Sequence, residues 1–120
     1  MNNSKTSVLN VKTYSFAIRV VKLAQFLQNE KNEYVLSKQI IRSGTSIGAL
    51  VRESEFGQSK LDFIHKLSIA LKEANETDYW LSLLRDTGYI DERLAESLQN
   101  DCNEIIPLLV SSIKTAKKNL

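Results

Sequence analysis

SKLDFIHKLSIALKEANETDYWLSLL, residues 59–84, is the stretch of sequence that decides the fold. Its small and apolar residues recur in alternating steps of four and three, which is the period of a helix that packs one side against other helices. Ser59 followed three residues later by Asp62 is typical of a helix N-terminus, so the helix is predicted to begin here. The residues of this predicted buried seam are Phe63, Leu67, Ala70, Ala74, Thr77, Leu81 and Leu84.

Two further helices are predicted before this stretch. Residues 1–12 are expected to form a flexible N-terminal arm, and residues 13–120 a single four-helix-bundle domain. Apolar residues at helical spacing follow the arm until a polar break at residues 29–33. A second helix is predicted from about Tyr34 to Gly57, where glycine is expected to take the left-handed conformation that ends many helices.

A fourth helix is predicted after residue 91, since Asp91 can cap its first turn. Pro107 lies inside its apolar pattern and removes one backbone hydrogen bond, which predicts a kink near Asn103. Two shorter helices are the alternative, but the apolar period continues through the proline. Short connections between the helices predict an all-α, antiparallel up-down-up-down four-helix bundle with a kinked last helix.

The overall composition is that of an ordinary soluble globular protein, with 42% hydrophobic and 25% charged residues in 120. A single cysteine excludes an internal disulfide and is typical of a reducing compartment. Residues 1–12 contain no apolar core of a secretory signal, and no apolar run approaches the ~18 residues of a membrane span. We therefore expect a cytoplasmic protein without membrane contact.

The net charge of +2 is unevenly distributed along the chain. Residues 1–60 contain nine Lys and Arg against four Asp and Glu, and residues 61–120 contain seven against ten. One interpretation is two solvated faces of opposite average sign. The other is a basic half that meets an acidic partner, either nucleic acid or the acidic half of a second copy.

Two glycines, Gly44 and Gly48, stand four residues apart in the second predicted helix, where each costs about 1 kcal/mol relative to alanine. Such a small-residue face lets another helix come close, within the chain or in another subunit. A phosphate loop is disfavoured, because the pattern G-x-x-x-x-G-K-[ST] and a preceding strand are both missing. Trp80 is likewise expected to be a packing or interface residue rather than a platform for stacked bases.

Four charged residues near the apolar seams are predicted to form a buried polar cluster: Arg42, Glu53, Glu73 and Glu76. An unpaired buried charge costs several kcal/mol, so the arginine is expected to pair with one or more glutamates. A di-iron bundle would need Glu-x-x-His from each of two helices, and this chain has one histidine. We therefore expect no metal, no cofactor and no catalytic residue.

The string QIIRSGTSIGA at residues 39–49, Glu53, and the string KEANET at residues 72–77 with Tyr79 and Trp80 resemble the proteins encoded in intervening sequences of bacterial 23S ribosomal RNA genes. The resemblance extends from about residue 15 to residue 117. It implies an antiparallel four-helix bundle that assembles into a closed, pentameric ring without catalytic activity.

One residue departs from the pattern of that family. Leu50 stands where the family usually has Asn, so a polar contact from the second helix is expected to be missing, and a network that includes Glu53 to be smaller or rearranged. An accessory protein of diversity-generating retroelements is also similar, and its basic ring binds nucleic acid. The resemblance therefore also implies RNA or DNA binding.

The first functional hypothesis is a non-enzymatic homo-oligomer that binds RNA or DNA and no small-molecule substrate. A ring agrees with the charge distribution, because the basic half of one copy can meet the acidic half of the next. The alternatives are a scaffold that binds another protein and has no nucleic-acid role, and a small metalloenzyme. The expected nucleic-acid contacts lie on the first two helices: Lys12, Arg19, Lys22, Lys38 and Arg52.

Overall fold

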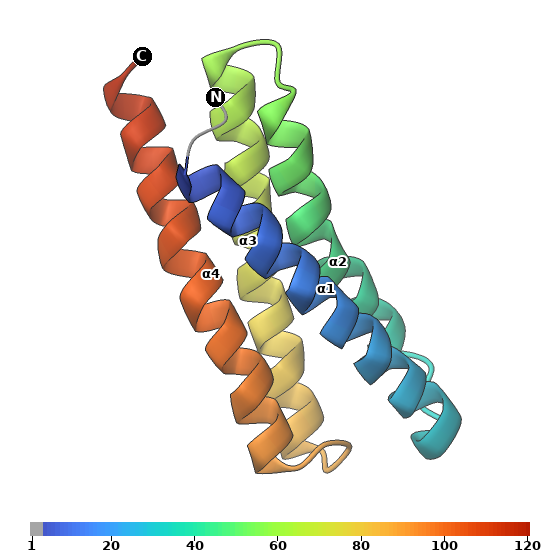
Figure 1. Cartoon of the computed structure of the whole chain (residues 1–120). Coiled ribbons are helices and arrows are strands. Elements are labelled where there is room, and N and C mark those ends of the chain that lie inside the picture. Colours follow the sequence, from blue (N-terminus) through green and yellow to red (C-terminus); the bar gives the residue numbers. More distant parts are fainter. Residues whose placement is uncertain (1–3) are drawn as a thin grey trace.

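The protein is a bundle of four long helices, and the computed structural model describes residues 4–120 of it (Figure 1). The helices are α1 (Ser4–Lys31), α2 (Leu36–Glu55), α3 (Lys60–Asp86) and α4 (Glu92–Lys118), and no strand occurs among these residues. The bundle is elongated, with extents of 47 × 21 × 19 Å. The all-α four-helix bundle predicted from the sequence is confirmed.

Each helix packs against the next one in the chain, and α4 returns to α1. Among the described residues the backbones of α1 and α3 do not approach each other closely, so these two helices lie diagonally opposite in the bundle. The start of α1 and the end of α4 lie at the same end of the molecule, beside the α2–α3 turn (Figure 1). Toward the other end α1 leads away from α4, and the α1–α2 hairpin separates from the α3–α4 hairpin (Figure 1).

The predicted seam of α3 forms the centre of the core, and all seven of its residues are buried. The helix begins as predicted, because the hydroxyl of Ser59 accepts a hydrogen bond of 3.0 Å from the N–H of Asp62. Asp91 caps α4 in the same way by accepting from the N–H of Leu94 at 2.8 Å. These two caps satisfy N–H groups that would otherwise lack a partner at the helix ends.

The arm predicted at residues 1–12 is wrong for residues 4–12, which belong to α1; residues 1–3 lie outside the described part of the chain. Leu9 is fully buried, and the hydroxyl of Thr13 donates to its carbonyl oxygen at 2.6 Å. Leu9, Thr13 and Phe16 are all buried and form a core face that covers about two turns of α1. Val8 and Val11 flank Leu9 but are both exposed, so the apolar residues of this segment show no clear helical period.

Helix α4 is one continuous helix with Pro107 inside it, so the alternative of two shorter helices is excluded. Leu98, Cys102, Ile105 and Leu109 form an unbroken buried face on both sides of the proline. Burial of this face holds the helix together across the hydrogen bond that proline cannot make.

Gly57 in the α2–α3 turn and Gly88 in the α3–α4 turn take different backbone conformations. Gly88 has φ of +82° and ends α3 in the left-handed conformation, which suits glycine. Gly57 does not take a positive φ, so the left-handed cap predicted there is wrong. A Cβ on Gly57 would lie 3.0 Å from Oδ2 of Asp62 and 3.2 Å from the carbonyl oxygen of Ser54, so the turn leaves little room for a side chain there.

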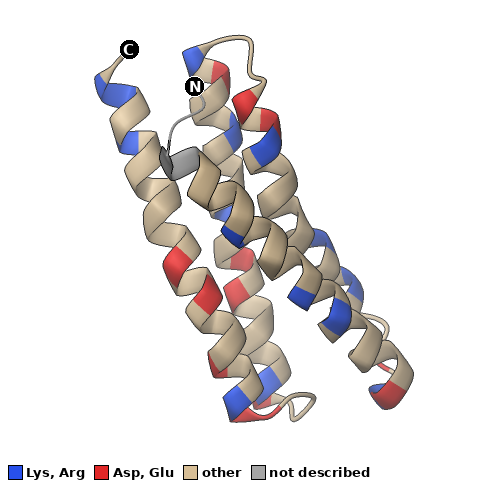
Figure 2. Ribbon diagram, viewed as in Figure 1, with Lys and Arg blue, Asp and Glu red and all other residues tan. Residues whose placement is uncertain are grey.

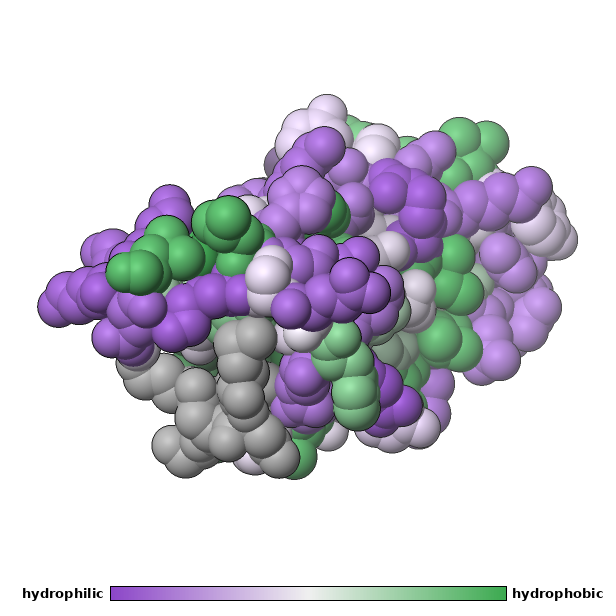
Figure 3. All heavy atoms as spheres, turned by 90° about the horizontal axis from the view of Figure 1, so that it is seen from above, coloured by the Kyte–Doolittle hydropathy of each residue, from purple (hydrophilic) through white to green (hydrophobic). Residues whose placement is uncertain are grey.

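The described surface is mixed in character. Lys and Arg outnumber Asp and Glu on α1 and α2, whereas α4 has acidic residues in its first two thirds and lysines toward its C-terminal end (Figure 2). Apolar side chains break the polar surface at several places when the bundle is viewed from above (Figure 3). None of the described helices has the length and apolar character needed to cross a membrane.

Candidate functional site

Arg42 on α2 reaches across to two carboxylates of α3. Its Nη1 lies 3.4 Å from Oε2 of Glu73, and its Nη2 donates a hydrogen bond to Oε2 of Glu76. The indole N–H of Trp80 donates to the same Glu76 oxygen at 3.1 Å. This hydrogen bond, aided by Arg42, holds the pKa of Glu76 below its ordinary value of 4.5, although partial burial opposes the shift. Protein groups therefore neutralise both carboxylates.

The predicted buried cluster needs two corrections. First, the cluster is not buried, because half of the Arg42 side chain is exposed and Glu76 is 30% exposed. Second, Glu53 is not part of it. Glu53 lies on α2 three turns from Arg42 and forms an ion pair of 3.6 Å with Lys66 instead. Spacing along α2 could have excluded Glu53 in advance.

Gly44 and Gly48 are packing residues within the chain, on the face of α2 that meets α1. A Cβ on Gly44 would lie 2.8 Å from both methyl carbons of Val20, and one on Gly48 would lie 3.3 Å from Oγ1 of Thr13. The backbone of α2 thus approaches α1 more closely than alanine would allow at Gly44. Trp80 is partly buried against the core, and its ring meets Tyr79 edge to face at 5.2 Å between centroids.

The five predicted nucleic-acid contacts do not form one free basic surface. Lys12 lies 2.7 Å from Oε2 of Glu104 and Arg19 lies 2.7 Å from Oδ2 of Asp101, so both cations join α1 to α4. Arg19 also donates to the hydroxyl of Ser97 at 2.9 Å. The three others are exposed and have no ion pair among the described residues: Lys22, Lys38 and Arg52.

Two polar features that the sequence reasoning missed organise the α1–α2 turn and the core. The buried carboxylate of Glu33 accepts hydrogen bonds from the N–H groups of Val35, Leu36 and Ser37 at 2.8–3.1 Å, and so caps α2. Deep in the core, Thr77 donates from α3 to the hydroxyl of Ser43 on α2 at 2.9 Å. A glutamate just before a helix was an available clue, but the polar run around Glu33 favoured a solvated break.

Leu50, the departure from the family pattern, packs partly buried against the core. Cys102 is fully buried, and burial raises the pKa of its thiol to about 12, so it is a core residue and no nucleophile at neutral pH. His65 is exposed. Within residues 4–120 no group of three or more His, Cys, Asp or Glu is arranged to hold a metal ion.

Helix α1 carries apolar residues on two opposite sides. Its inner side supplies the core, while Val11, Tyr14 and Ile18 lie on its outer side with 68%, 61% and 42% of their surface exposed. Helix α3 also has large apolar residues outside the core, Leu61 and Tyr79, which are 66% and 60% exposed. Helices α2 and α4 each confine their apolar residues more strictly to one side.

A groove of about 990 Å³ lies beside this outer side of α1. Exposed aromatic side chains stand at its edge, Tyr14 from α1 and Phe56 from the α2–α3 turn. Arg52, Glu53 and Lys66 add charge of both signs. Such a mixed, open groove suits a protein surface better than an enclosed small-molecule site.

These features define an all-α four-helix-bundle protein whose candidate sites are exposed helix faces and grooves. The chain belongs to the 23S rRNA-intervening sequence protein family, whose model matches residues 6–111. It is similar to a protein of unknown function from the S23 ribosomal protein family of Bacteroides thetaiotaomicron. Their structures match with a TM-score of 0.90 and 58% identity over 92% of this chain and 98% of that one. No curated protein matches the sequence.

Proposed function

We propose that the protein is a non-enzymatic subunit of a closed homo-oligomeric ring of five copies, and that the ring binds RNA or DNA. The observation that carries the proposal is the outward apolar face of α1, formed by Val11, Tyr14 and Ile18, together with two separate exposed apolar residues of α3, Leu61 and Tyr79. These helices lie diagonally opposite in the bundle, so one copy offers apolar surface on two opposite sides.

Two different faces on opposite sides favour head-to-tail association. When the α1 face of one copy covers the α3 face of the next, each of the two copies still has one free face to which further copies can add. The series closes into a ring when every contact turns the next copy by the same closing angle, which is about 72° for five copies. Removing apolar surface from water contributes roughly 25 cal/mol per Å². The first half of the chain is basic and the second half is acidic. The same head-to-tail contact therefore also brings opposite charges of neighbouring copies together.

A non-enzymatic role agrees with the state of the ionisable groups. Arg42 and Trp80 hold Glu76, and the Cys102 thiol is buried with a raised pKa. These groups stabilise the protein as they stand, and their pairing takes away the free carboxylate pair that acid–base chemistry would use.

Nucleic-acid binding rests on the exposed cations of the first two helices. Lys22, Lys38 and Arg52 have no acidic partner among the described residues and are free to contact phosphates. Lys12 and Arg19 are held by α4, so they are expected to contribute less. Ring assembly would multiply a modest charge on each subunit.

Light scattering tests the assembly. The wild-type mass is expected to be five times the 13.6 kDa of one chain. Ile18→Glu places a charge on the outer side of α1 and is expected to lower the mass, whereas Val35→Glu, in the α1–α2 turn and 72% exposed, is the matched control. A wild-type monomer at all concentrations, or an unchanged Ile18→Glu assembly, would contradict the proposal.

Fluorescence anisotropy with labelled RNA and DNA across a salt series tests the binding. Phosphate contacts make log affinity fall linearly with log salt concentration. We expect measurable binding at low salt and a steep salt slope. No binding of either nucleic acid at low salt would remove this half of the proposal and leave the assembly intact.

The mixed groove beside α1 favours a second function, a scaffold that binds another protein. In that case Phe56→Ala, which removes an exposed aromatic edge of the groove, would abolish capture of a defined protein that nuclease treatment leaves bound. The same variant would keep its affinity for nucleic acid under the first proposal.

A further inference from the structure

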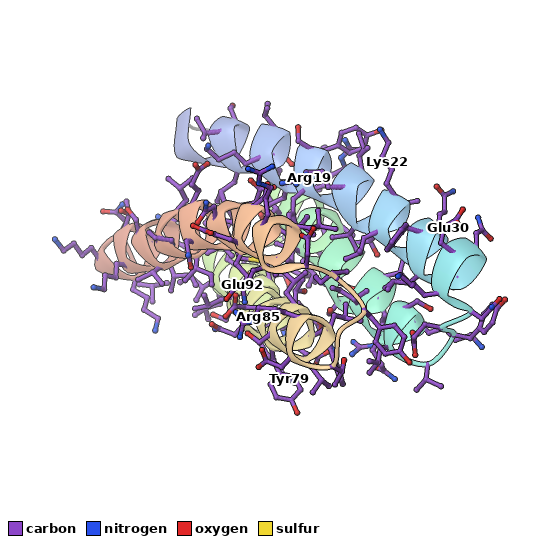
Figure 4. The ribbon with its side chains drawn as sticks, turned by 90° about the horizontal axis from the view of Figure 1, so that it is seen from below. Arg19, Lys22, Glu30, Tyr79, Arg85 and Glu92 are labelled. Carbon is purple, nitrogen blue, oxygen red and sulfur yellow. The ribbon has the colours of Figure 1, made fainter. Side chains whose placement is uncertain are left out.

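A small cleft opens between α1 and α4, where the two helices diverge. Its volume is about 230 Å³. Figure 4 shows Arg19 and Lys22 on α1 at this side of the molecule, with Glu30 further along the same helix. The cleft is lined by Arg19, Lys22, Leu23, Phe26, Leu94 and Leu98.

The interior of the cleft is apolar. Leu23 and Leu98 are buried and form its inner wall, and Leu94 is partly buried. Phe26 keeps 39% of its surface exposed although it lies on α1 one turn from the buried Leu23. An exposed aromatic side chain in an apolar cleft offers a surface for stacking a flat ring.

One lysine lies over the face of the Phe26 ring, and a second lines the cleft. Lys22 lines the cleft and is exposed, and Nζ of Lys31 lies 5.8 Å from the centre of the Phe26 ring. Neither lysine has an ion pair among the described residues. Arg19 is held by Asp101 and Ser97, and Glu30, one turn beyond Phe26, is the exposed acid on this part of α1. A ligand of this cleft therefore combines a flat apolar ring with negative charge.

We propose that the α1–α4 cleft binds an unstacked base of a single-stranded polynucleotide, RNA or DNA, with the base against Phe26 and the flanking phosphates near Lys22 and Lys31. The proposal rests on the nucleic-acid half of the proposed function and names its site. A base inside a duplex is covered by its neighbours and cannot enter such a cleft, so the cleft selects single strands. Stacking on an aromatic side chain is tolerant of sequence, since every base has a flat face.

The test measures anisotropy of labelled single-stranded RNA and single-stranded DNA of mixed sequence with five exposed-site variants of the full chain, one of which is a control. Phe26→Ala removes the stacking surface and is expected to weaken binding roughly 5- to 150-fold. Phe26→Trp keeps an aromatic face and is expected to retain the affinity. Lys22→Gln is expected to weaken binding and to reduce the salt slope by about 0.7.

Glu30→Gln gives an effect of opposite sign, since it removes the acid near the proposed phosphate path, and it is expected to tighten binding. The matched control is Lys117→Gln, because Lys117 is an exposed lysine at the far end of α4, near the C-terminus. It is expected to leave the affinity within twofold. Circular dichroism and light scattering on each variant show whether the fold and the assembly are retained.

Each outcome decides the proposal. Wild-type binding that Phe26→Ala leaves unchanged would overturn this site and keep nucleic-acid binding elsewhere on the ring. Equal affinity for a duplex of the same length would also overturn it, because phosphate contacts alone would then explain the binding. No binding of RNA or DNA would remove both the site and the nucleic-acid half of the proposed function, while the mass measurement would still report on the ring.

Discussion

Gly44→Ala tests how closely α1 and α2 pack. In a helix interior alanine is favoured over glycine by about 1 kcal/mol, so helix propensity alone predicts a more stable protein. The structure predicts the reverse, because the new Cβ would lie 2.8 Å from two methyl carbons of Val20. Val20 is fully buried, and a β-branched side chain in a helix has one strongly preferred rotamer, so it cannot move aside cheaply.

The magnitude follows from these two opposing terms. Overpacking of a core costs about 1–3 kcal/mol, which offsets or exceeds the gain in propensity. Gly48→Ala makes the same chemical change one turn further along α2, where the nearest atom to a new Cβ is Oγ1 of Thr13 at 3.3 Å. This contact needs a much smaller adjustment. We therefore expect Gly44→Ala to be less stable than Gly48→Ala by about 1–3 kcal/mol.

Urea unfolding of both variants measures this difference. With a typical slope of about 2 kcal/mol per M, the two midpoints are expected to differ by roughly 1 M. Protein concentration must be the same in all samples, since any self-association would shift the apparent stability. Val20→Ala removes the two methyl groups and is expected to be less damaging in the Gly44→Ala background than in the wild type. A Gly44→Ala variant as stable as Gly48→Ala would refute the close packing of the two helices.

Three further predictions concern single side chains. Trp80→Phe removes the N–H donor of Glu76 and is expected to raise the pKa of that carboxyl, as followed by NMR titration. The folded-state pKa of Glu76 lies below 4.5, so the stability that this carboxylate adds is present above pH 4.5 and is lost as the pH falls through the folded-state pKa. Trp80→Phe is expected to weaken this pH dependence of stability. Cys102 is expected to resist alkylation at pH 8 in the native state and to react on unfolding; rapid native labelling would show that the thiol is accessible. Glu33→Ala is expected to lower the free energy of unfolding by about 1–2 kcal/mol in urea melts, because three N–H groups at the start of α2 lose their acceptor; an unchanged midpoint would show that water replaces the carboxylate.

Helical periodicity was enough to predict the bundle, and the reason is visible in α3. Its seven seam residues repeat at the helical period and are all buried, and Ser59 and Asp91 cap the helices that follow them. The start of α1 could not be predicted in this way. Leu9 is buried by the tertiary packing of α1 on the bundle, whereas its apolar neighbours Val8 and Val11 are exposed.

Pairing of charges was only partly predictable. The sequence indicates that Arg42 needs acidic partners, and Glu73 and Glu76 supply them. It does not indicate that Arg19 faces Asp101, because that contact joins residues 82 positions apart and depends on how α1 and α4 are placed side by side. The cleft at Phe26 has the same origin, since it exists only where these two helices diverge.

An even number of antiparallel helices has one more consequence. The start of α1 and the end of α4 share one end of the molecule, and the α1–α2 turn lies at the other (Figure 1). Rotational symmetry would repeat this polarity in every subunit, so all the turns of a ring would point the same way. A flexible polynucleotide held by one subunit would then meet identical neighbours at high effective concentration, and avidity rather than any single contact would set how long it stays bound.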